Sequence, residues 1–211
     1  KSICIECDEQ FLTHPSPILF DDIRMGCHYD ARQEIAGWDL PGFDASDWTP
    51  AEPCEAPRGI SRLCDTDPIV VTQELAPVSV NYYDELAFAH TDNSPEAAPL
   101  PETIRPCVHV VDFGINSAGV TRLHIRNAKP GQKIVIRHAE YFAGGNFDVK
   151  TTVFDGTPER KELYYEYGQT DVYYCRGGDE VFTPKFKYDG FRYAYVEGIE
   201  PDQWQDDTLT M

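Results

Sequence analysis

Alternation of apolar and polar residues with a period of two dominates the chain after about residue 105, and no other feature limits the fold as strongly. Residues 120–126 alternate in this way, and residues 132–137 repeat the pattern after a turn that contains Pro130-Gly131. Period two places alternate side chains on opposite faces of a β-strand. Pro-Gly suits a type II turn, because glycine adopts positive φ at little cost. The pattern predicts a β-hairpin, with His124 and His138 as cross-strand neighbours.

A second pair of strands is predicted around the turn at Gly177-Gly178. Residues 171–175 and 181–186 are rich in aromatic and β-branched side chains, and the sequence between them consists of turn formers. The 16 Pro and 15 Gly in 211 residues also favour short strands and tight turns over long helices. We therefore expect an all-β fold, an antiparallel two-sheet β-sandwich of jelly-roll type, galactose-binding-like or concanavalin-like, with few or no long helices.

The last strand of the sandwich is expected near the end of the chain. Strict alternation would place Phe191, Tyr193 and Tyr195 on one face of it. Phe191 would then fill the core, and Asp189 and Arg192 would form an ion pair at the rim. We interpret this rim, Asp189 with Arg192, as a surface that faces a neighbouring domain.

The charge balance excludes several classes of partner. The chain has 36 acidic and 18 basic residues, a formal net charge of -18, so its surface repels phosphate backbones and anionic membranes. The sequence contains no run of 18 apolar residues that would span a bilayer. We expect no nucleic acid and no membrane as partners, whereas a neutral sugar is unaffected by the charge.

The seven cysteines leave at least one thiol unpaired within the chain. An unpaired thiol favours a reducing compartment, which indicates the cytoplasm, with an extracellular or periplasmic location as the alternative. Cys4 and Cys7 form the single Cys-x-x-Cys, without the further ligands that a zinc site needs, so no metal ligand is predicted. Because Lys1 starts within a pattern and is not Met, we expect the natural N-terminus to precede it.

Three phrases in the sequence carry a resemblance to a known family. They are Tyr29-Asp30-Ala31-Arg32, the stretch from Asp112-Phe113-Gly114 to Gly119, and Tyr188-Asp189-Gly190-Phe191-Arg192-Tyr193. Their order and spacing resemble the accessory β-domains that precede the catalytic barrel of bacterial α-L-rhamnosidases. The resemblance implies that residues 1–75 are the C-terminal part of the N-terminal module and that residues 76–198 are a β-sandwich module. Residues 199–211 would connect to a catalytic (α/α) barrel.

The resemblance also implies a function. The chain would be the accessory portion of a glycosidase that releases terminal α-L-rhamnose, and it would support the barrel and the approach of rhamnose-containing glycosides. The family's catalytic carboxylates lie in the barrel, so no catalytic residue is assigned here and the chain is expected to be inactive alone. The oligomeric state stays open.

Acidic and aromatic residues in the first half leave one alternative open. Each close pair of aspartates, such as Asp44 and Asp47, lies among turn formers and is interpreted as structural. Trp38, beside Gly37 and Asp39, is the best candidate for an exposed aromatic platform, and Trp38 with Asp39 is the predicted substrate-binding pair. The alternative function is thus an autonomous carbohydrate-binding module for rhamnosides, with calcium as its only candidate cofactor.

Overall fold

The computed structural model describes residues 8, 10–56, 58–60, 62–88, 103–143, 146–148 and 168–211. The chain divides into two compact units. The first comprises residues 1–16 and 33–70, and the second comprises residues 17–32 and 71–211. The Cys4-x-x-Cys7 motif lies outside the described residues.

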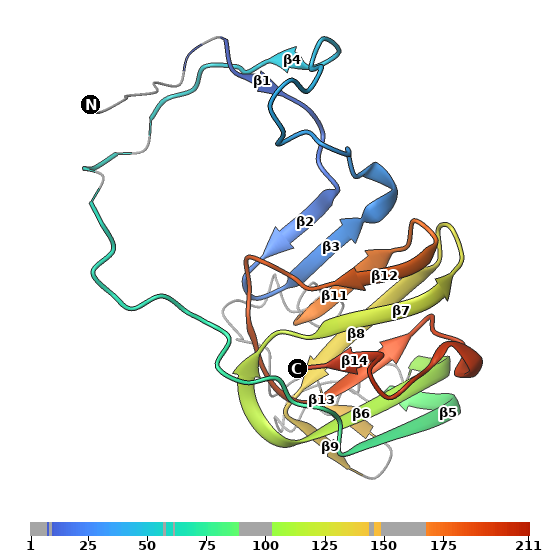
Figure 1. Ribbon diagram of the computed structural model, residues 1–211. Helices are drawn as coiled ribbons and strands as arrows, with labels where there is room; N and C mark the ends of the chain where they lie inside the picture. The colour runs from blue at the N-terminus through green and yellow to red at the C-terminus, as the bar shows by residue number, and fades with distance from the viewer. Residues whose placement is uncertain are drawn as a thin grey trace. The chain divides into compact units, whose positions relative to one another are not determined.

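The second unit is a sandwich of two sheets (Figure 1). The larger sheet has seven strands in the order β2-β3-β11-β8-β13-β6-β5. Its strands, in chain order, are β2 (Ile18–Asp22), β3 (Gly26–Asp30), β5 (Ser79–Phe88), β6 (Thr103–Gly119), β8 (Lys133–Ala139), β11 (Thr170–Tyr174) and β13 (Asp189–Glu197). All its pairings are antiparallel except that of β3 with β11, which is parallel.

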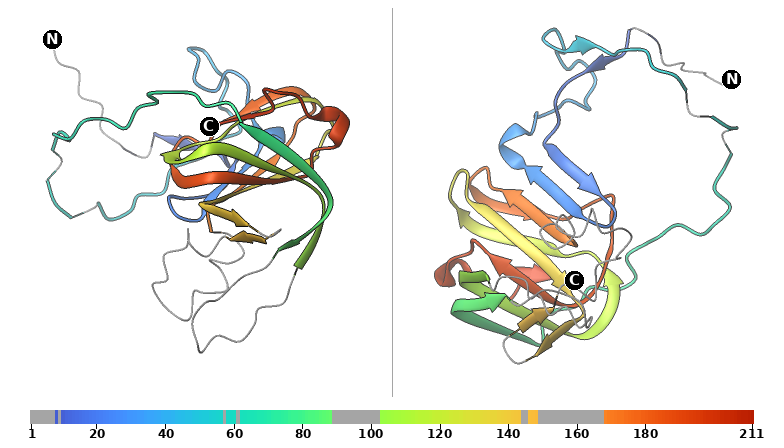
Figure 2. Two further views of the ribbon diagram at one scale, coloured as in Figure 1. Left: turned by 90° about the horizontal axis from the view of Figure 1, so that it is seen from below. Right: turned by 180° about the vertical axis from the view of Figure 1, so that it is seen from behind.

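The smaller sheet has the order β12-β7-β14, and it is antiparallel throughout. Its strands are β7 (Arg122–Ala128), β12 (Gly178–Phe182) and β14 (Leu209–Thr210). A separate two-stranded ribbon pairs β9 (Tyr141–Ala143) with β10 (Asn146–Asp148). Figure 2 shows the two layers from two further directions.

The main core lies between the two sheets. Leu123, Ile125 and Leu209 from the smaller sheet pack in one cluster with Ile136 and Val196 from the larger sheet. A second cluster, which includes Val108, Val110 and Tyr195, lies on the other face of the larger sheet. Burial of alternate residues explains the period-two pattern of the sequence, and the predicted all-β sandwich is confirmed.

The first unit contains little regular structure. Its strands β1 (Leu12–Thr13) and β4 (Thr49–Pro50) form one short antiparallel pair. The described helices of the chain are two 3₁₀ turns, η1 (Ala31–Gln33) and η4 (Pro201–Gln203). None of the described helices has the length and apolar character that crossing a membrane requires.

The predicted turns are present, but the predicted hairpin pairings are wrong. Gly131 has φ of 79°, as a type II turn requires, yet β7 pairs with β12 and β14 while β8 pairs with β11 and β13. The turn therefore carries the chain from one sheet to the other. The turn between β11 and β12 does the same. His124 and His138 consequently lie in different sheets and are not cross-strand neighbours.

A β-bulge breaks the alternation expected for the last strand. The register of β13 against β6 shifts between Phe191 and Tyr193. Phe191 therefore packs in the core between the sheets, whereas Tyr193 and Tyr195 belong to the cluster on the opposite face. Between Phe191 and Tyr193, β13 advances two residues while β6 advances five, an irregularity that strict alternation does not anticipate.

The expected domain boundaries at residues 75 and 198 stay predictions, but strand pairing crosses both of them. The sheet of the second unit takes β2 and β3 from before residue 75. Residues 199–211, expected as a connector, contain Ile199 and Leu209, both 1% exposed, and strand β14. These residues are part of the sandwich.

Candidate functional site

An open depression of about 600 Å³ lies within the first unit. Consecutive turns shape it, since the N–H groups of Leu40, Phe43 and Trp48 donate to carbonyls three residues earlier, at 3.0–3.2 Å. Its apolar lining consists of Phe11, Leu12, Trp38, Leu40, Phe43 and Trp48, and Asp8 and Gln10 supply polar groups. Apolar walls with a few polar groups are typical of small-molecule sites.

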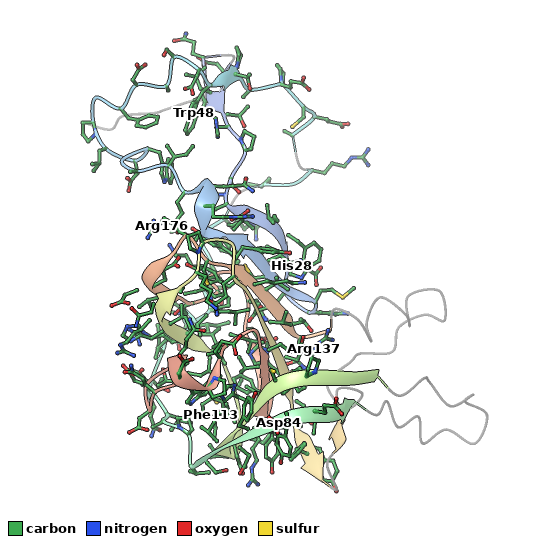
Figure 3. All side chains as sticks on the ribbon, turned by 90° about the vertical axis from the view of Figure 1, so that its right-hand side faces the viewer. His28, Trp48, Asp84, Phe113, Arg137 and Arg176 are labelled. Atoms are coloured by element: carbon green, nitrogen blue, oxygen red, sulfur yellow. The ribbon has the colours of Figure 1, made fainter. Side chains whose placement is uncertain are left out.

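The two tryptophans of this depression differ in their surroundings. Trp48 (labelled in Figure 3) is half-buried, with its ring centroid 5.3 Å from that of His14 and 5.7 Å from that of Phe43. Trp38 is 61% exposed. Asp39 is also exposed but is not among the lining residues. The depression thus includes Trp38 of the predicted pair, together with Asp8 and Gln10, which sequence reasoning missed.

The rim of the second unit is built differently from the expectation. Arg192 donates two hydrogen bonds to Asp112, from Nε to Oδ1 at 2.8 Å and from Nη2 to Oδ2 at 2.9 Å. Hydrogen bonds from Arg192 lower the pKa of Asp112 below its usual value. Asp189 is only 3% exposed and does not pair with Arg192. The predicted Asp189–Arg192 ion pair is therefore wrong, because side chains three residues apart in a strand point to opposite faces.

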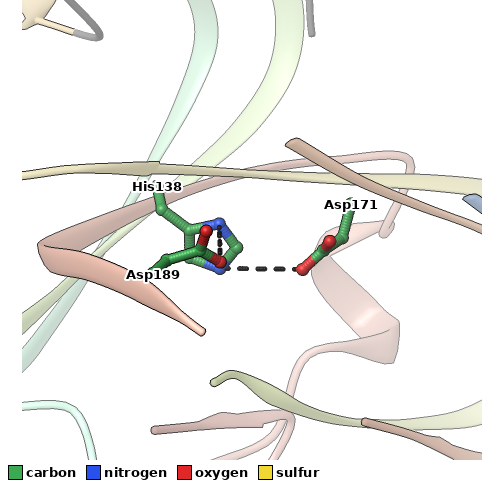
Figure 4. A group of neighbouring side chains, drawn as sticks. All are labelled: His138, Asp171 and Asp189. Carbon is green, nitrogen blue, oxygen red and sulfur yellow. Dashed lines mark ion pairs between the residues drawn. The ribbon is translucent and has the colours of Figure 1, made fainter. Parts of the chain in front are cut away.

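Asp189 instead belongs to a buried cluster with His138, Asp171 and Lys187. Three adjacent strands contribute to it, with β8 supplying His138 between β11 and β13, which supply Asp171 and Asp189 (Figure 4). The ammonium nitrogen of Lys187 lies 2.7 Å from Asp171 Oδ1 and 2.6 Å from Asp189 Oδ2. The four side chains are at most 1% exposed. The cluster is sealed from solvent.

The surroundings of the cluster fix the orientation of each group. His138 Nδ1 donates to the Gln169 carbonyl at 2.8 Å and lies 3.3 Å from Asp189 Oδ2. The backbone N–H of Cys27 donates to Asp171 Oδ1 at 2.8 Å. Burial by itself lowers the pKa of Lys187, but the charges of Asp171 and Asp189 outweigh that effect and raise it.

This cluster is also the one group of metal-ligand type found among the residues that the structure describes. Ligand atoms of His138, Asp171 and Asp189 lie within 4.8 Å of one another. The ammonium of Lys187 already touches both carboxylates and supplies the positive charge that a metal ion would bring. The cluster therefore does not suit a metal ion.

Several other carboxylates have structural partners. Asp22 Oδ1 accepts from the N–H groups of Arg24 and Met25, and Asp44 Oδ1 accepts from that of Ser46. These are turn-capping arrangements, as the sequence predicted. Asp207 accepts two hydrogen bonds from Arg126. No pair of these carboxylates has the arrangement of a catalytic dyad.

Two family models match the chain and together cover most of it. The alpha-L-rhamnosidase N-terminal domain matches residues 1–73. The bacterial alpha-L-rhamnosidase concanavalin-like domain matches residues 102–211, which is more than half of the chain. The second match includes most of both sheets of the sandwich.

Curated proteins and a solved structure give the same result. The chain is 33% identical over 184 residues to an alpha-L-rhamnosidase of Streptomyces avermitilis, covering 87% of this chain and 15% of that protein. It is 29% identical over 198 residues to one of Formosa agariphila, covering 92% and 18%. The structure of alpha-L-rhamnosidase from Dictyoglumus thermophilum matches 97% of this chain and 20% of its own, with a TM-score of 0.71 and 29% identity. The chain thus spans a fifth or less of these relatives' length.

Proposed function

The chain belongs to the bacterial α-L-rhamnosidase family through its N-terminal and concanavalin-like domains, and we propose that it serves as the accessory β-region of such an enzyme. In this role it supports a catalytic (α/α) barrel in the same polypeptide. The barrel releases terminal α-L-rhamnose from glycosides, and the accessory region shapes the approach of the substrate. The chain by itself has no hydrolytic activity.

One observation carries this proposal. Four carboxylates of the second unit hold the sandwich together. Asp171 and Asp189 belong to the buried lysine cluster, and Asp112 and Asp207 form bidentate pairs with arginine. Glycoside hydrolysis needs two carboxylates about 5–10 Å apart on either side of an open site. The described residues of the second unit offer a scaffold and no such site. Support of a larger neighbour is consistent with relatives at least five times as long.

Docking can be tested at the Asp112–Arg192 pair, which we propose as the rim that faces the barrel. The test protein is a chimeric rhamnosidase in which this chain replaces the aligned fifth of the Dictyoglumus thermophilum enzyme. Arg192→Ala should lower the melting temperature of the chimera more than that of the isolated chain, because only the chimera contains the barrel. Equal losses in both contexts would contradict docking at this rim.

Arg126 offers a matched control for that experiment. It makes a bidentate pair with Asp207 at 2.7 Å, as Arg192 does with Asp112, but on the smaller sheet. Arg126→Ala should cost the chimera and the isolated chain the same stability. Hydrolysis of an aryl rhamnoside by the isolated chain would overturn the accessory role altogether.

The exposed Trp38 favours a second candidate function, an autonomous carbohydrate-binding module for rhamnosides. Its ring is 61% exposed in a depression that also presents Asp8 and Gln10. An aromatic face with adjacent polar groups can stack on a sugar ring and bond its hydroxyls. We propose calcium as the cofactor to be tested with it, since an acidic side chain lies at the same depression.

Calorimetric titration of the chain with L-rhamnose, with calcium and then with chelator, tests this candidate. Saturable heat that Trp38→Ala abolishes would establish binding at the depression. Phe186→Ala is the matched control, because Phe186 is an aromatic residue of the other unit with a similar exposure of 66%. No heat at millimolar sugar would leave the chain an accessory scaffold alone.

A further inference from the structure

The buried cluster described above places an amine against a carboxyl group in a site without solvent. Lys187 precedes β13 and Asp171 lies on β11, so the contact joins two parts of the sheet that are separated by β8. From this geometry we propose that Lys187 Nζ and Asp171 Cγ condense to an intramolecular isopeptide bond, with Asp189 as the proton carrier. This inference does not depend on the proposed function.

The contacts identify Asp171 as the carboxyl group that is attacked. Its Oδ1 accepts hydrogen bonds from both Lys187 Nζ at 2.7 Å and the Cys27 N–H at 2.8 Å. A backbone N–H at that oxygen stabilises the negative charge that develops when nitrogen adds to the carbon. The other oxygen, Oδ2, is buried without a hydrogen-bond partner among the described residues and lies 4.0 Å from His138 Nε2. Oδ2 is thus the oxygen suited to leave.

Asp189 is placed to move the proton. Its Oδ2 lies 2.6 Å from Lys187 Nζ and 3.3 Å from His138 Nδ1. Its Oδ1 is buried without a hydrogen-bond partner in the part of the chain that the structure describes. A carboxylate within hydrogen-bond reach of an attacking amine is the geometry of a general base.

The reaction balances without any co-reactant. The resting pair carries its proton on Lys187, whose charge the two carboxylates stabilise. Transfer of this proton to Asp171 Oδ2 gives the neutral amine and the carboxylic acid that react. The nitrogen adds to Cγ, and Asp189 takes a second proton from it. Asp189 then returns this proton to Oδ2 as the Cγ–Oδ2 bond breaks. The products are an amide and one water molecule, and no group is oxidised or reduced.

Proximity replaces the activation that amide formation in solution requires. Two reactants held at contact distance react as if at a very high local concentration, about 10⁵ M or more in well-oriented cases. Phe191, whose ring centroid lies 4.6 Å from that of His138, covers the cluster on the core side. The expelled water leaves to bulk solvent, and the sealed site then protects the amide from hydrolysis.

Intact-mass measurement of the denatured and reduced chain tests the proposal. The chain should be lighter than its sequence by one water molecule, and tryptic digestion should give one branched peptide that joins Lys187 to Asp171. Lys187→Arg, which keeps the positive charge but cannot form this amide, should restore the full mass. Lys185→Arg, at an exposed neighbouring lysine, should leave the loss unchanged. Asp189→Asn should slow the loss by about tenfold or more.

Two outcomes would overturn the proposal. One is the full sequence mass after prolonged incubation of a chain whose cooperative unfolding shows that it is folded. The other is a loss of water that persists in Lys187→Arg, or that tandem mass spectrometry places at Asp189-Gly190, since that dipeptide can lose water by closing a succinimide ring. Sequencing of the wild-type peptides decides between these results even if the arginine variant does not fold.

Discussion

At the scale of single residues, the face of the strand to which a side chain points decides its burial and its ion-pair partner. Closeness in sequence matters less. Asp189 and Arg192 are close in sequence, yet one enters a buried cluster and the other pairs with Asp112 across the strands. The types of these residues could be predicted to form ion pairs. The partners could not, because they depend on which strand lies beside β13, and Asp112 of β6 is 80 residues away from Arg192 in sequence.

His109 should make the stability of the chain depend on pH. It is 3% exposed and stacks on Trp204 with ring centroids 4.2 Å apart, and burial lowers its pKa from 6.5 to about 4. Between these two values the unfolded chain binds a proton that the folded chain does not, so stability falls as pH is lowered from 6.5 to 4. The contribution should amount to about 3 kcal/mol.

Urea unfolding of the wild type and of His109→Phe between pH 4 and 7 measures this effect. Phenylalanine keeps an aromatic ring beside Trp204 but cannot titrate, so the variant should lose the part of the pH dependence that His109 contributes. A variant with the same slope as the wild type would assign the dependence to other groups.

Gly198 should tolerate no side chain, because its backbone passes very close to another strand. Its φ is 85°, and an added Cβ would collide with the carbonyl oxygen of Lys133. Gly178 has a similar φ of 89° with open space around it. Gly178→Ala should cost about 1 kcal/mol from backbone strain, and Gly198→Ala about 3 kcal/mol or more. Denaturant unfolding of both measures the difference, and equal costs would contradict the steric argument.

At the scale of elements, strand positions could be predicted but strand partners could not. The alternating runs around Pro130-Gly131 and Gly177-Gly178 lie where β7, β8, β11 and β12 are found. Local sequence signals a turn and two strands equally well whether the strands pair or lie in opposite sheets. The pairing depends on strands that lie far away in sequence. Besides β12, β7 pairs with β14, and besides β8, β11 pairs with β3.

The short strand β14 should be essential to the smaller sheet. Leu209 pairs with Leu123 of β7 and is 1% exposed. Leu209→Ala should lower the free energy of unfolding by about 2–4 kcal/mol, because it leaves a cavity in the core. Leu63→Ala, at a leucine that is 97% exposed, should change it by less than about 0.5 kcal/mol. Chemical denaturation checks both, and a small loss at Leu209 would show that β14 is dispensable.

At the scale of the whole molecule, the sandwich takes its strands from sequence segments before and after residues 33–70. Residues 17–32 supply β2 and β3 before the chain enters residues 33–70 of the first unit. The candidate depression could be predicted in part, since Trp38 stands among turn formers. Its other walls could not, because Phe11 and Leu12 reach it only through the pairing of β1 with β4.

A cut at residues 62–66, within the first unit, should leave the two fragments together. The described residues between β4 and β5 contain no strand, and Ile60 and Leu63 there are 84% and 97% exposed. A specific protease site introduced at residues 62–66 should therefore be cut readily in the folded chain. The fragments should co-elute in size-exclusion chromatography, because β3 stays paired with β11. Separation without denaturant would contradict this.

The parallel pairing of β3 with β11 can form only after most of the chain has been synthesised. The Cys27 N–H and the Asp171 carboxylate that accepts its hydrogen bond are 144 residues apart in sequence. At about 5–20 residues per second, a ribosome takes roughly seven to thirty seconds to deliver β11 after β3. During that time the edge of β3 that will pair with β11 stays open, and Ile18, Leu19 and Phe20 lie beside it on β2, so chaperone binding during translation should concentrate on this β2–β3 segment.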